Sequence, residues 1–224
     1  MPSDSSGYRP LLGRRMRGPA VAAIVLALIV IAALGMRYAG QDMAGRGDRI
    51  LDAMISHRLR GGRPITYVLA NLGDPAQTAI LVAVVAGAAA VARRWSGVLL
   101  AIAGTTVAVA VTELILKPLI GRLRSGELSF PSGHTTAVAA VAVAAAILIG
   151  GARWPRSIAL RVLAAIAAIA VAAGVAVSLV AQHLHYLTDT VGGYCVAVAT
   201  VLGVALGLDY WCAARQRGDG GLAG

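Results

Sequence analysis

Six long apolar stretches, separated by polar segments, dominate the pattern of the chain. Each stretch is about as long as a helix needs to be to cross the roughly 30 Å hydrocarbon core of a bilayer. Strands usually end after about 4–8 residues, so these lengths favour helices over strands. The pattern predicts an all-α polytopic membrane protein with six transmembrane helices, over the ranges Pro19–Met36, Pro75–Ala92, Gly97–Leu116, Thr135–Ala152, Val162–Ala181 and Thr190–Tyr210.

The polar segment between the first two stretches contains a further helical pattern. Within Asp48–Arg60, apolar residues recur at helical spacing with charged residues between them. This pattern is typical of an amphipathic helix that lies on the outer leaflet between the first and second spans. A helix in a solvated loop fits equally well, so both interpretations stay open. The apolar positions are Ile50, Leu51, Met54, Ile55 and Leu59.

The chain is expected to form one membrane domain with two short tails. We expect a cytoplasmic tail at residues 1–18, the six-helix domain at 19–211 and a second cytoplasmic tail at 212–224. Basic residues precede the first apolar stretch, as they do in a secretory signal peptide. Because this stretch is long, has no clear small-residue cleavage site and is followed by five more, we interpret it as a retained first helix.

Composition narrows the function classes. Hydrophobic residues make up 58% of the 224 residues and charged residues 13%, which is too apolar for a soluble or a disordered chain. The net charge of +10 comes from 20 basic and 10 acidic residues. The basic residues lie between apolar stretches, so they indicate membrane topology and not binding of nucleic acid. Cys195 and Cys212 are too few for a disulfide scaffold.

The placement of the basic residues predicts how the helices are oriented. The connections on one side carry 11 basic residues, and every short one contains arginine. The other side carries nine, of which six lie in or beside one long loop. The positive-inside rule therefore places both termini in the cytoplasm, and we expect the plasma membrane as the location. Trp95, Trp154 and Trp211 fall at the cytoplasmic face, as interfacial anchors would.

Polar residues that are costly at membrane depth gather in two segments, both expected at the extracytoplasmic face. The first segment, Glu113–His134, contains two cations, Lys117 and Arg124. It also contains a turn at Ser132 and Gly133 that leads into a predicted helix. The backbone N–H groups of such a turn and the helix N-terminus suit an anion.

The second segment, Gln182–Asp189, contains His185 four residues before Asp189. At this spacing the two side chains share one face of a helical turn. A carboxylate beside an imidazole holds its tautomer and stabilises the imidazolium, which makes the histidine a useful nucleophile or base. Two cations, a helix N-terminus and two histidines together indicate a phosphoryl-transfer site.

These segments resemble the type 2 phosphatidic acid phosphatase (PAP2) superfamily, whose motifs are K-x6-R-P, P-S-G-H and S-R-x5-H-x3-D. The first motif is present from Lys117 to Arg124, with Ser125 in place of the proline, and the second is intact at Pro131–His134. The resemblance covers most of the chain from about Asp48 onward.

The third motif departs from the family at one position. It begins with Ser178 and ends with His185 and Asp189, but Leu179 stands where the family has an arginine. That arginine helps to hold the phosphate in the family. Its absence implies weaker catalysis, a shifted substrate or a non-catalytic relative, unless a neighbouring residue compensates.

The resemblance implies a lipid phosphate phosphatase that needs no cofactor and no metal. His185 would attack phosphorus and form a phosphohistidine, and Asp189 would orient its ring. His134 would protonate the leaving oxygen and later activate water. The phosphoryl oxygens would be held by Lys117, Arg124, Ser132 and Gly133.

Several neighbouring residues are candidates for supporting roles or have simpler interpretations. Glu113 lies one turn before Lys117 and is expected to pair with it. The residues that could compensate for the missing arginine are Arg122, Gln182 and His183. His183 and His185 are two apart and do not share a helical face, which disfavours zinc. Asp74 is interpreted as a cap or turn residue.

Three function classes stay open at this point. The first is a membrane phosphatase, or a phosphotransferase, acting on polyprenyl (di)phosphate, phosphatidic acid, phosphatidylglycerol phosphate or a lipid-linked sugar phosphate. The second is a non-catalytic protein of the same fold that binds or moves a lipid phosphate. The third is an unrelated small transporter or channel accessory. The expected partners are a lipid phosphate and membrane lipids, with no nucleic acid, and the sequence does not indicate an oligomeric state.

Overall fold

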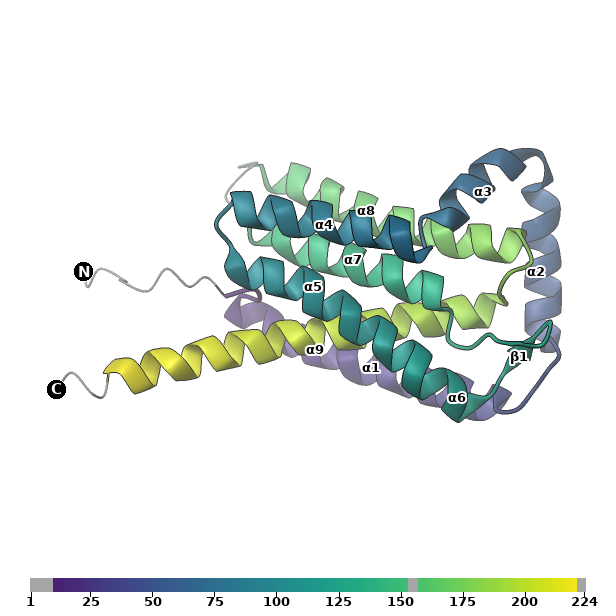
Figure 1. Cartoon of the computed structure of the whole chain (residues 1–224), viewed down its shortest axis with the longest axis horizontal. Coiled ribbons are helices and arrows are strands. Elements are labelled where there is room, and N and C mark those ends of the chain that lie inside the picture. Colours follow the sequence, from purple (N-terminus) through teal and green to yellow (C-terminus); the bar gives the residue numbers. More distant parts are fainter. Residues whose placement is uncertain (1–9, 153–156, 221–224) are drawn as a thin grey trace.

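The computed structural model describes residues 10–152 and 157–220 and shows a bundle of long helices (Figure 1). In these residues five helical segments are long and apolar enough to span a membrane. The all-α membrane fold predicted from the pattern is therefore confirmed. The five segments are Arg14–Tyr38 (α1), Trp95–Ile120, Gly133–Gly150 (α7), Ile158–Ala181 (α8) and Leu187–Arg215 within α9, which itself covers Leu187–Gly220.

The remaining predicted span, Pro75–Ala92, is the second in chain order, and in the structure it is part of a bent pair of helices. Helix α4 (Pro75–Val91) reaches spanning length only together with the residues before it, Arg60–Asn71, and the two parts meet at an angle of 65°. The part before the break comprises a 3₁₀ turn, Arg60–Gly62, and α3 (Arg63–Asn71). Proline follows the break directly and opens α4, where a missing backbone N–H costs nothing.

The span Trp95–Ile120 contains three helical segments in sequence. Helix α5 (Trp95–Ala110) continues into a π-helical turn, η2 (Val111–Leu116), and then into α6 (Lys117–Ile120). A π-turn adds a residue to the helical repeat and is frequent at functional sites. Here it carries Glu113, four residues before Lys117.

Helix α7 lies in the middle of the bundle and packs against α5, α8 and α9. Every residue from Thr135 to Ala144 is buried, and most of them are alanine or valine. Such small side chains let neighbouring backbones approach closely, which is how helices associate in membranes. The turn before α7 is therefore held at a fixed place among its neighbours.

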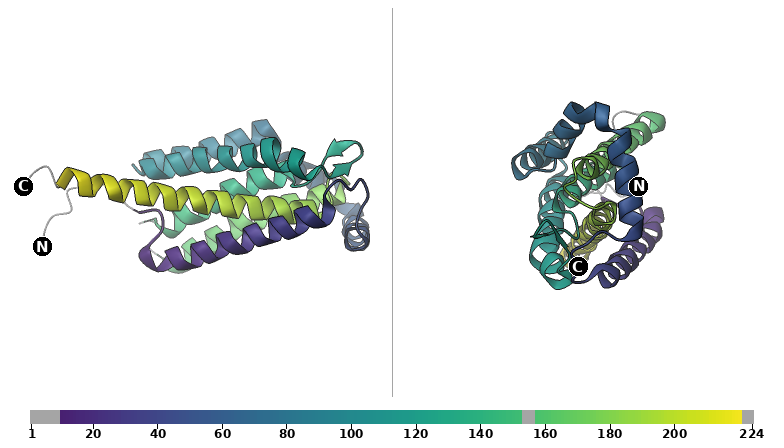
Figure 2. Two further views of the ribbon diagram at one scale, coloured as in Figure 1. Left: turned by 90° about the horizontal axis from the view of Figure 1, so that it is seen from below. Right: turned by 90° about the vertical axis from the view of Figure 1, so that its right-hand side faces the viewer.

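Helix α2 (Arg46–Arg58) crosses one end of the bundle (Figures 1 and 2). The amphipathic helix predicted over Asp48–Arg60 is thus present. Its inward face is polar, because Asp48 and Asp52 are buried, whereas Ile50, Leu51 and Met54 are exposed. Its place on a bilayer stays a prediction.

The start of α1 and the end of α9 lie together at the end of the bundle opposite α2 (Figure 1). There the backbone N–H groups of Leu11 and Leu12 donate to the Asp209 carboxylate at 2.7 and 2.9 Å. Helix α1 begins five residues before the predicted apolar stretch, and α9 continues into the predicted tail. Trp154, together with the basic residues Arg9, Arg153 and Arg156 used to predict orientation, lies outside the described residues.

A two-stranded hairpin that the sequence pattern did not predict joins α6 to α7. Strand β1 (Leu123–Arg124) pairs in antiparallel fashion with β2 (Glu127–Leu128). The two residues between them, Ser125 and Gly126, both have positive φ, as a tight hairpin turn requires. The hairpin lies at the α2 end of the bundle (Figure 1), and Arg124 Nη1 lies 3.8 Å from Asp52 Oδ2 of α2.

Candidate active site

The two polar segments predicted to meet are in direct contact. The backbone N–H of Ser132 donates to the Asp189 carbonyl at 3.0 Å. Helix α9 packs so closely on this turn that a Cβ at Gly193 would lie 2.6 Å from the Ser132 carbonyl oxygen. Glycine at that position is therefore what allows the start of α9 to reach the turn before α7.

His134 and His185 consequently face each other. Their ring centroids are 6.2 Å apart and the ring planes are inclined by 58°. The two imidazoles therefore belong to one site.

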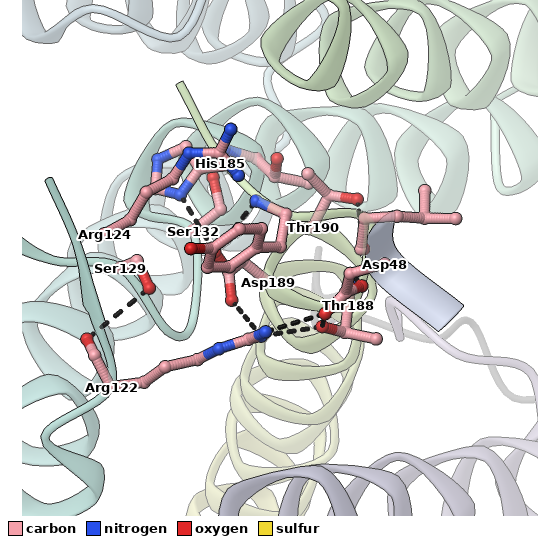
Figure 3. Close-up of polar contacts among 12 residues, drawn as sticks. Asp48, Arg122, Arg124, Ser129, Ser132, His185, Thr188, Asp189 and Thr190 are labelled. Carbon is pink, nitrogen blue, oxygen red and sulfur yellow. Dashed lines mark hydrogen bonds and ion pairs between the residues drawn. The ribbon is translucent and has the colours of Figure 1, made fainter. Parts of the chain in front are cut away.

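Asp189 is the buried partner of His185. One carboxylate oxygen, Oδ2, lies 3.6 Å from His185 Nδ1, beyond hydrogen-bond length, and accepts the backbone N–H of Tyr186 at 3.0 Å. The other oxygen, Oδ1, accepts from Arg122 at 2.6 Å (Figure 3). Such contacts are often long without substrate and shorten when it binds. The carboxylate is thus held from both sides with one oxygen toward the imidazole.

Arg122 is completely buried and lies between Asp189 and α2. Its Nη1 donates to Asp189 and to the Thr188 hydroxyl, and its Nη2 donates to Asp48 at 2.7 Å (Figure 3). The rings of Tyr38 and Tyr186 lie 4.0 and 4.4 Å from the guanidinium carbon. With its charge already paired, Arg122 supports the carboxylate of the pair.

Two carboxylates of α2 belong to this site, and sequence reasoning missed both. Asp48 accepts the backbone N–H of Thr188 at 3.1 Å, and Asp52 accepts that of Leu187 at 3.1 Å. Both N–H groups lie at the start of α9, where the helix dipole favours negative charge. The signal in the sequence was the spacing of four, which places the two aspartates on one face of α2.

Burial raises the pKa of Asp52 to about 6. The nearby Asp48 carboxylate acts in the same direction. The backbone N–H of Leu187 and the charge of Arg124 oppose the rise. Asp52 therefore exchanges its proton close to neutral pH, next to a predicted phosphate-binding arginine.

The two predicted phosphate-binding cations differ in how they are held. Lys117 Nζ forms an ion pair with Glu113 Oε2 at 2.8 Å, as expected for these residues. Arg124 donates from Nε to the His183 carbonyl at 3.0 Å, and its guanidinium carbon lies 4.1 Å from the Tyr186 ring centroid. Its buried Nη1 has no hydrogen-bond partner in the described part of the chain. Nη1 also lies 3.8 Å from Asp52 Oδ2, so the charge of Arg124 is paired with a carboxylate of α2.

The predicted anion turn caps α7. Ser132 is the N-cap residue, and its hydroxyl accepts the backbone N–H of Thr135 at 3.3 Å. The Glu113 carboxylate lies directly against Gly133, where any side chain would overlap it. A carboxylate therefore occupies the space beside the first residue of α7, close to Lys117.

Two further residues have roles that differ from those considered for them. Asp74 precedes α4, and its carboxylate lies 3.0 Å from His134 Nε2 without making a capping bond to its own helix. Gln182 donates to the Thr66 hydroxyl at 2.8 Å and so ties α8 to α3. The missing arginine has no substitute at its own position, since Leu179 is wholly buried in the apolar core.

A cavity of about 890 Å³ extends from this site between α4 and α5. Its charged end is lined by Glu113, Lys117, Gly133 and His134. Farther along, its walls are mostly small and apolar and include Ala79, Val82, Ala83, Ala86, Ile102 and Val109.

Within residues 10–152 and 157–220, no group of three or more His, Cys, Asp or Glu side chains could hold a metal ion.

Comparison with known proteins gives two matches. The model of the PAP2 superfamily matches residues 97–211. The solved structure of the first transmembrane PAP2 type phosphatidylglycerolphosphate phosphatase from Bacillus subtilis has a similar fold, with a TM-score of 0.63 and 22% sequence identity. The match covers 85% of this chain and 96% of that chain. No curated protein sequence matches significantly.

Proposed function

The chain belongs to the PAP2 superfamily, and we propose that it is an integral membrane phosphatase that hydrolyses a lipid phosphomonoester or diphosphate. The observation that carries the proposal is the pair of facing rings, His134 and His185, 6.2 Å apart beside the cavity. A phosphate at the charged end of that cavity would leave the apolar part for a lipid chain.

In the first proposed step, His185 attacks phosphorus through Nε2. A P–N bond forms as the P–O bond to the leaving group breaks, and His134 gives a proton to the departing oxygen. The leaving group is the lipid alcohol from a phosphomonoester and the lipid monophosphate from a diphosphate. Asp189, fixed by Arg122, stabilises the positive charge that develops on the His185 ring.

In the second proposed step, His134 takes a proton from water as the water oxygen attacks the phosphohistidine. The P–N bond breaks, inorganic phosphate leaves, and His185 is restored. Lys117, Arg124 and the turn at Ser132 and Gly133 hold the phosphoryl oxygens in both steps. Fixed cations and a helix N-terminus aimed at these oxygens stabilise the transition state mainly through charge and position.

We propose that these cations make a metal unnecessary. Phosphate release by the purified protein is then expected to persist when EDTA is present. Loss of turnover in EDTA, restored by adding Mg²⁺, would contradict this part of the proposal.

Release of phosphate by variants of the two histidines tests the function directly. In detergent, His185→Ala is expected to lower turnover about a thousandfold or more, because the nucleophile is gone. His134→Ala should also lose most activity. His57→Ala is the matched control, since His57 is exposed on α2. Turnover by His185→Ala equal to that of the wild type would reject the phosphatase.

The substrate is proposed at the level of a class. An apolar cavity next to a phosphate site suits the lipid phosphates considered from the sequence, including polyprenyl (di)phosphate and phosphatidylglycerol phosphate. A panel of such lipids, assayed for inorganic phosphate, would rank them. Transfer of phosphate to a second lipid without release of inorganic phosphate would indicate a phosphotransferase.

We also propose that the site faces outward in the plasma membrane, with both termini in the cytoplasm. In a background with Cys195 and Cys212 replaced by alanine, Glu127→Cys is expected to react with an impermeant thiol reagent in intact cells. Ala92→Cys, at the opposite end of the bundle, should react only after lysis. The reverse labelling would invert the orientation.

Leu179 favours one other function, a non-catalytic protein that binds a lipid phosphate. The position of a phosphate-binding arginine of the family is here a wholly buried aliphatic side chain. This alternative predicts saturable binding of a lipid phosphate without release of phosphate. Turnover by the wild type that His185→Ala abolishes would reject it.

A further inference from the structure

We propose that Asp74 is a positioning residue for His134 and forms a second His–Asp pair of the site. This inference rests on the proposed phosphatase reaction, in which His134 exchanges a proton with the leaving oxygen and with water. Asp74 lies outside all three motifs, 60 residues before its partner.

The Asp74 carboxylate lies within hydrogen-bond distance of the His134 ring. The distance from Asp74 Oδ1 to His134 Nε2 is 3.0 Å. Asp74 is the residue before α4 and has extended backbone angles. An aspartate there ordinarily accepts an N–H of its own helix. This carboxylate makes no such bond and takes the imidazole instead.

The chain is shaped to bring Asp74 to this place. The break between α3 and α4 comprises residues 72–74 and so includes Asp74, and the two helices meet there at 65° (Figure 1 shows the bend). At the break, a Cβ on Gly73 would lie 2.6 Å from His134 Cβ and 3.0 Å from its Cα. No L side chain fits in that space, so a glycine lets the bend lie against the start of α7.

The pairing assigns the two ring nitrogens of His134. With Nε2 donating to Asp74, Nδ1 is the nitrogen left to exchange a proton with the substrate. The other charged or titratable groups near the ring are Lys117, at the same end of the cavity, and His185, across the site, with Glu113 beside Gly133. Lys117 disfavours a cationic ring, and Asp74 offsets this by stabilising the imidazolium that must donate the proton.

The first test separates proton transfer from simple structural support. For the full chain in detergent, kcat/KM is measured on a long-chain alkyl phosphate and on p-nitrophenyl phosphate. This ratio reports the steps up to departure of the leaving group. An alkoxide needs a proton as it leaves, whereas p-nitrophenolate does not. Asp74→Asn should therefore lower kcat/KM about tenfold or more on the alkyl phosphate and much less on p-nitrophenyl phosphate.

Two further variants complete this test. Asp74→Glu keeps the carboxylate and is expected to recover part of the lost activity on the alkyl phosphate. Asp42→Asn is the matched control, because Asp42 is exposed in the polar segment before α2, and it should match the wild type on both esters. Equal losses on both esters in Asp74→Asn, or no loss on either, would overturn the assignment.

The second test does not depend on turnover. The chain has four histidines, so the ring ¹⁵N signals of His134 can be assigned by comparison with His134→Ala. In the wild type at alkaline pH the proton is expected on Nε2, and in Asp74→Asn this preference should be lost. An unchanged tautomer would overturn the pairing. If the wild type released no phosphate from either ester, the proposed function would fail, and the tautomer would still decide the pairing.

Discussion

The site contains two histidine–aspartate contacts that are built in different ways. Asp189 is four residues after His185, wholly buried, and fixed by Arg122. Asp74 is 60 residues before His134, and both side chains of that pair are about 40% exposed, at 42% and 39%. The first contact is local in sequence and braced by a third side chain, whereas the second is remote in sequence and partly exposed.

The braced pair gains its rigidity from α2. Asp48, Arg122 and Asp189 form a chain of buried charges that also engages the start of α9. In surroundings of low dielectric each ion needs its partner, so the three side chains hold one arrangement. This suits a nucleophile, whose attack requires a fixed geometry.

The open pair lies beside the cavity. His134 lines the charged end of the cavity, and Asp74 is the last residue of the break before α4. The contact between Asp74 and His134 is partly exposed, so burial does not fix it as it fixes the contact between Asp189 and Arg122.

The largest expected effect comes from removing the brace. Arg122→Met leaves Asp48 and Asp189 buried without their common partner, which should cost about 3–5 kcal/mol of unfolding free energy. Thermal unfolding in detergent would show a lower midpoint, with phosphate release lost. Arg49→Met, an exposed arginine of α2, is the control and should unfold like the wild type. An unchanged midpoint for Arg122→Met would mean that the buried charges are not a brace.

A smaller effect is expected from moving the open pair. In Gly73→Ala the new Cβ would meet His134, so the bend must shift and carry Asp74 away. A displacement of about 1 Å can cost about a hundredfold in rate, and we expect kcat/KM on an alkyl phosphate to fall about tenfold to a hundredfold. Gly87→Ala, in open space on α4, should leave it unchanged. Full activity in Gly73→Ala would show that the pair of His134 and Asp74 tolerates displacement.

The smallest effect concerns Asp52, on the braced side. Its pKa of about 6, against an ordinary 3.8, means that the folded protein holds this proton more tightly than the unfolded chain does. Stability should therefore fall as pH rises from 3.8 to about 6 and then level off. In Asp52→Asn that part of the pH dependence should disappear from the melting curves. The same slope in variant and wild type would assign it to another group.

Sequence patterns predicted the helical membrane fold and the two site segments because both are local signals. Apolar length indicates a span, and the spacing of four indicated that His185 and Asp189 share a face. The hairpin at residues 123–128 was missed, since four strand residues leave no periodic pattern. Asp74 was interpreted as a cap or turn residue, and the contact of its side chain with His134 was not foreseen.

The amino-acid sequence by itself determined the order of the apolar helices and the candidate residues for phosphoryl chemistry. The length of an apolar stretch and the spacing of a motif are properties of residues close together in the sequence, so they can be recognised before the fold is known. Tertiary structure alone decided which carboxylate pairs with which cation or imidazole. Asp48 and Arg122, like Asp74 and His134, meet only because distant helices pack at one end of the bundle, and a polar group buried there must take whichever partner the packing brings within reach.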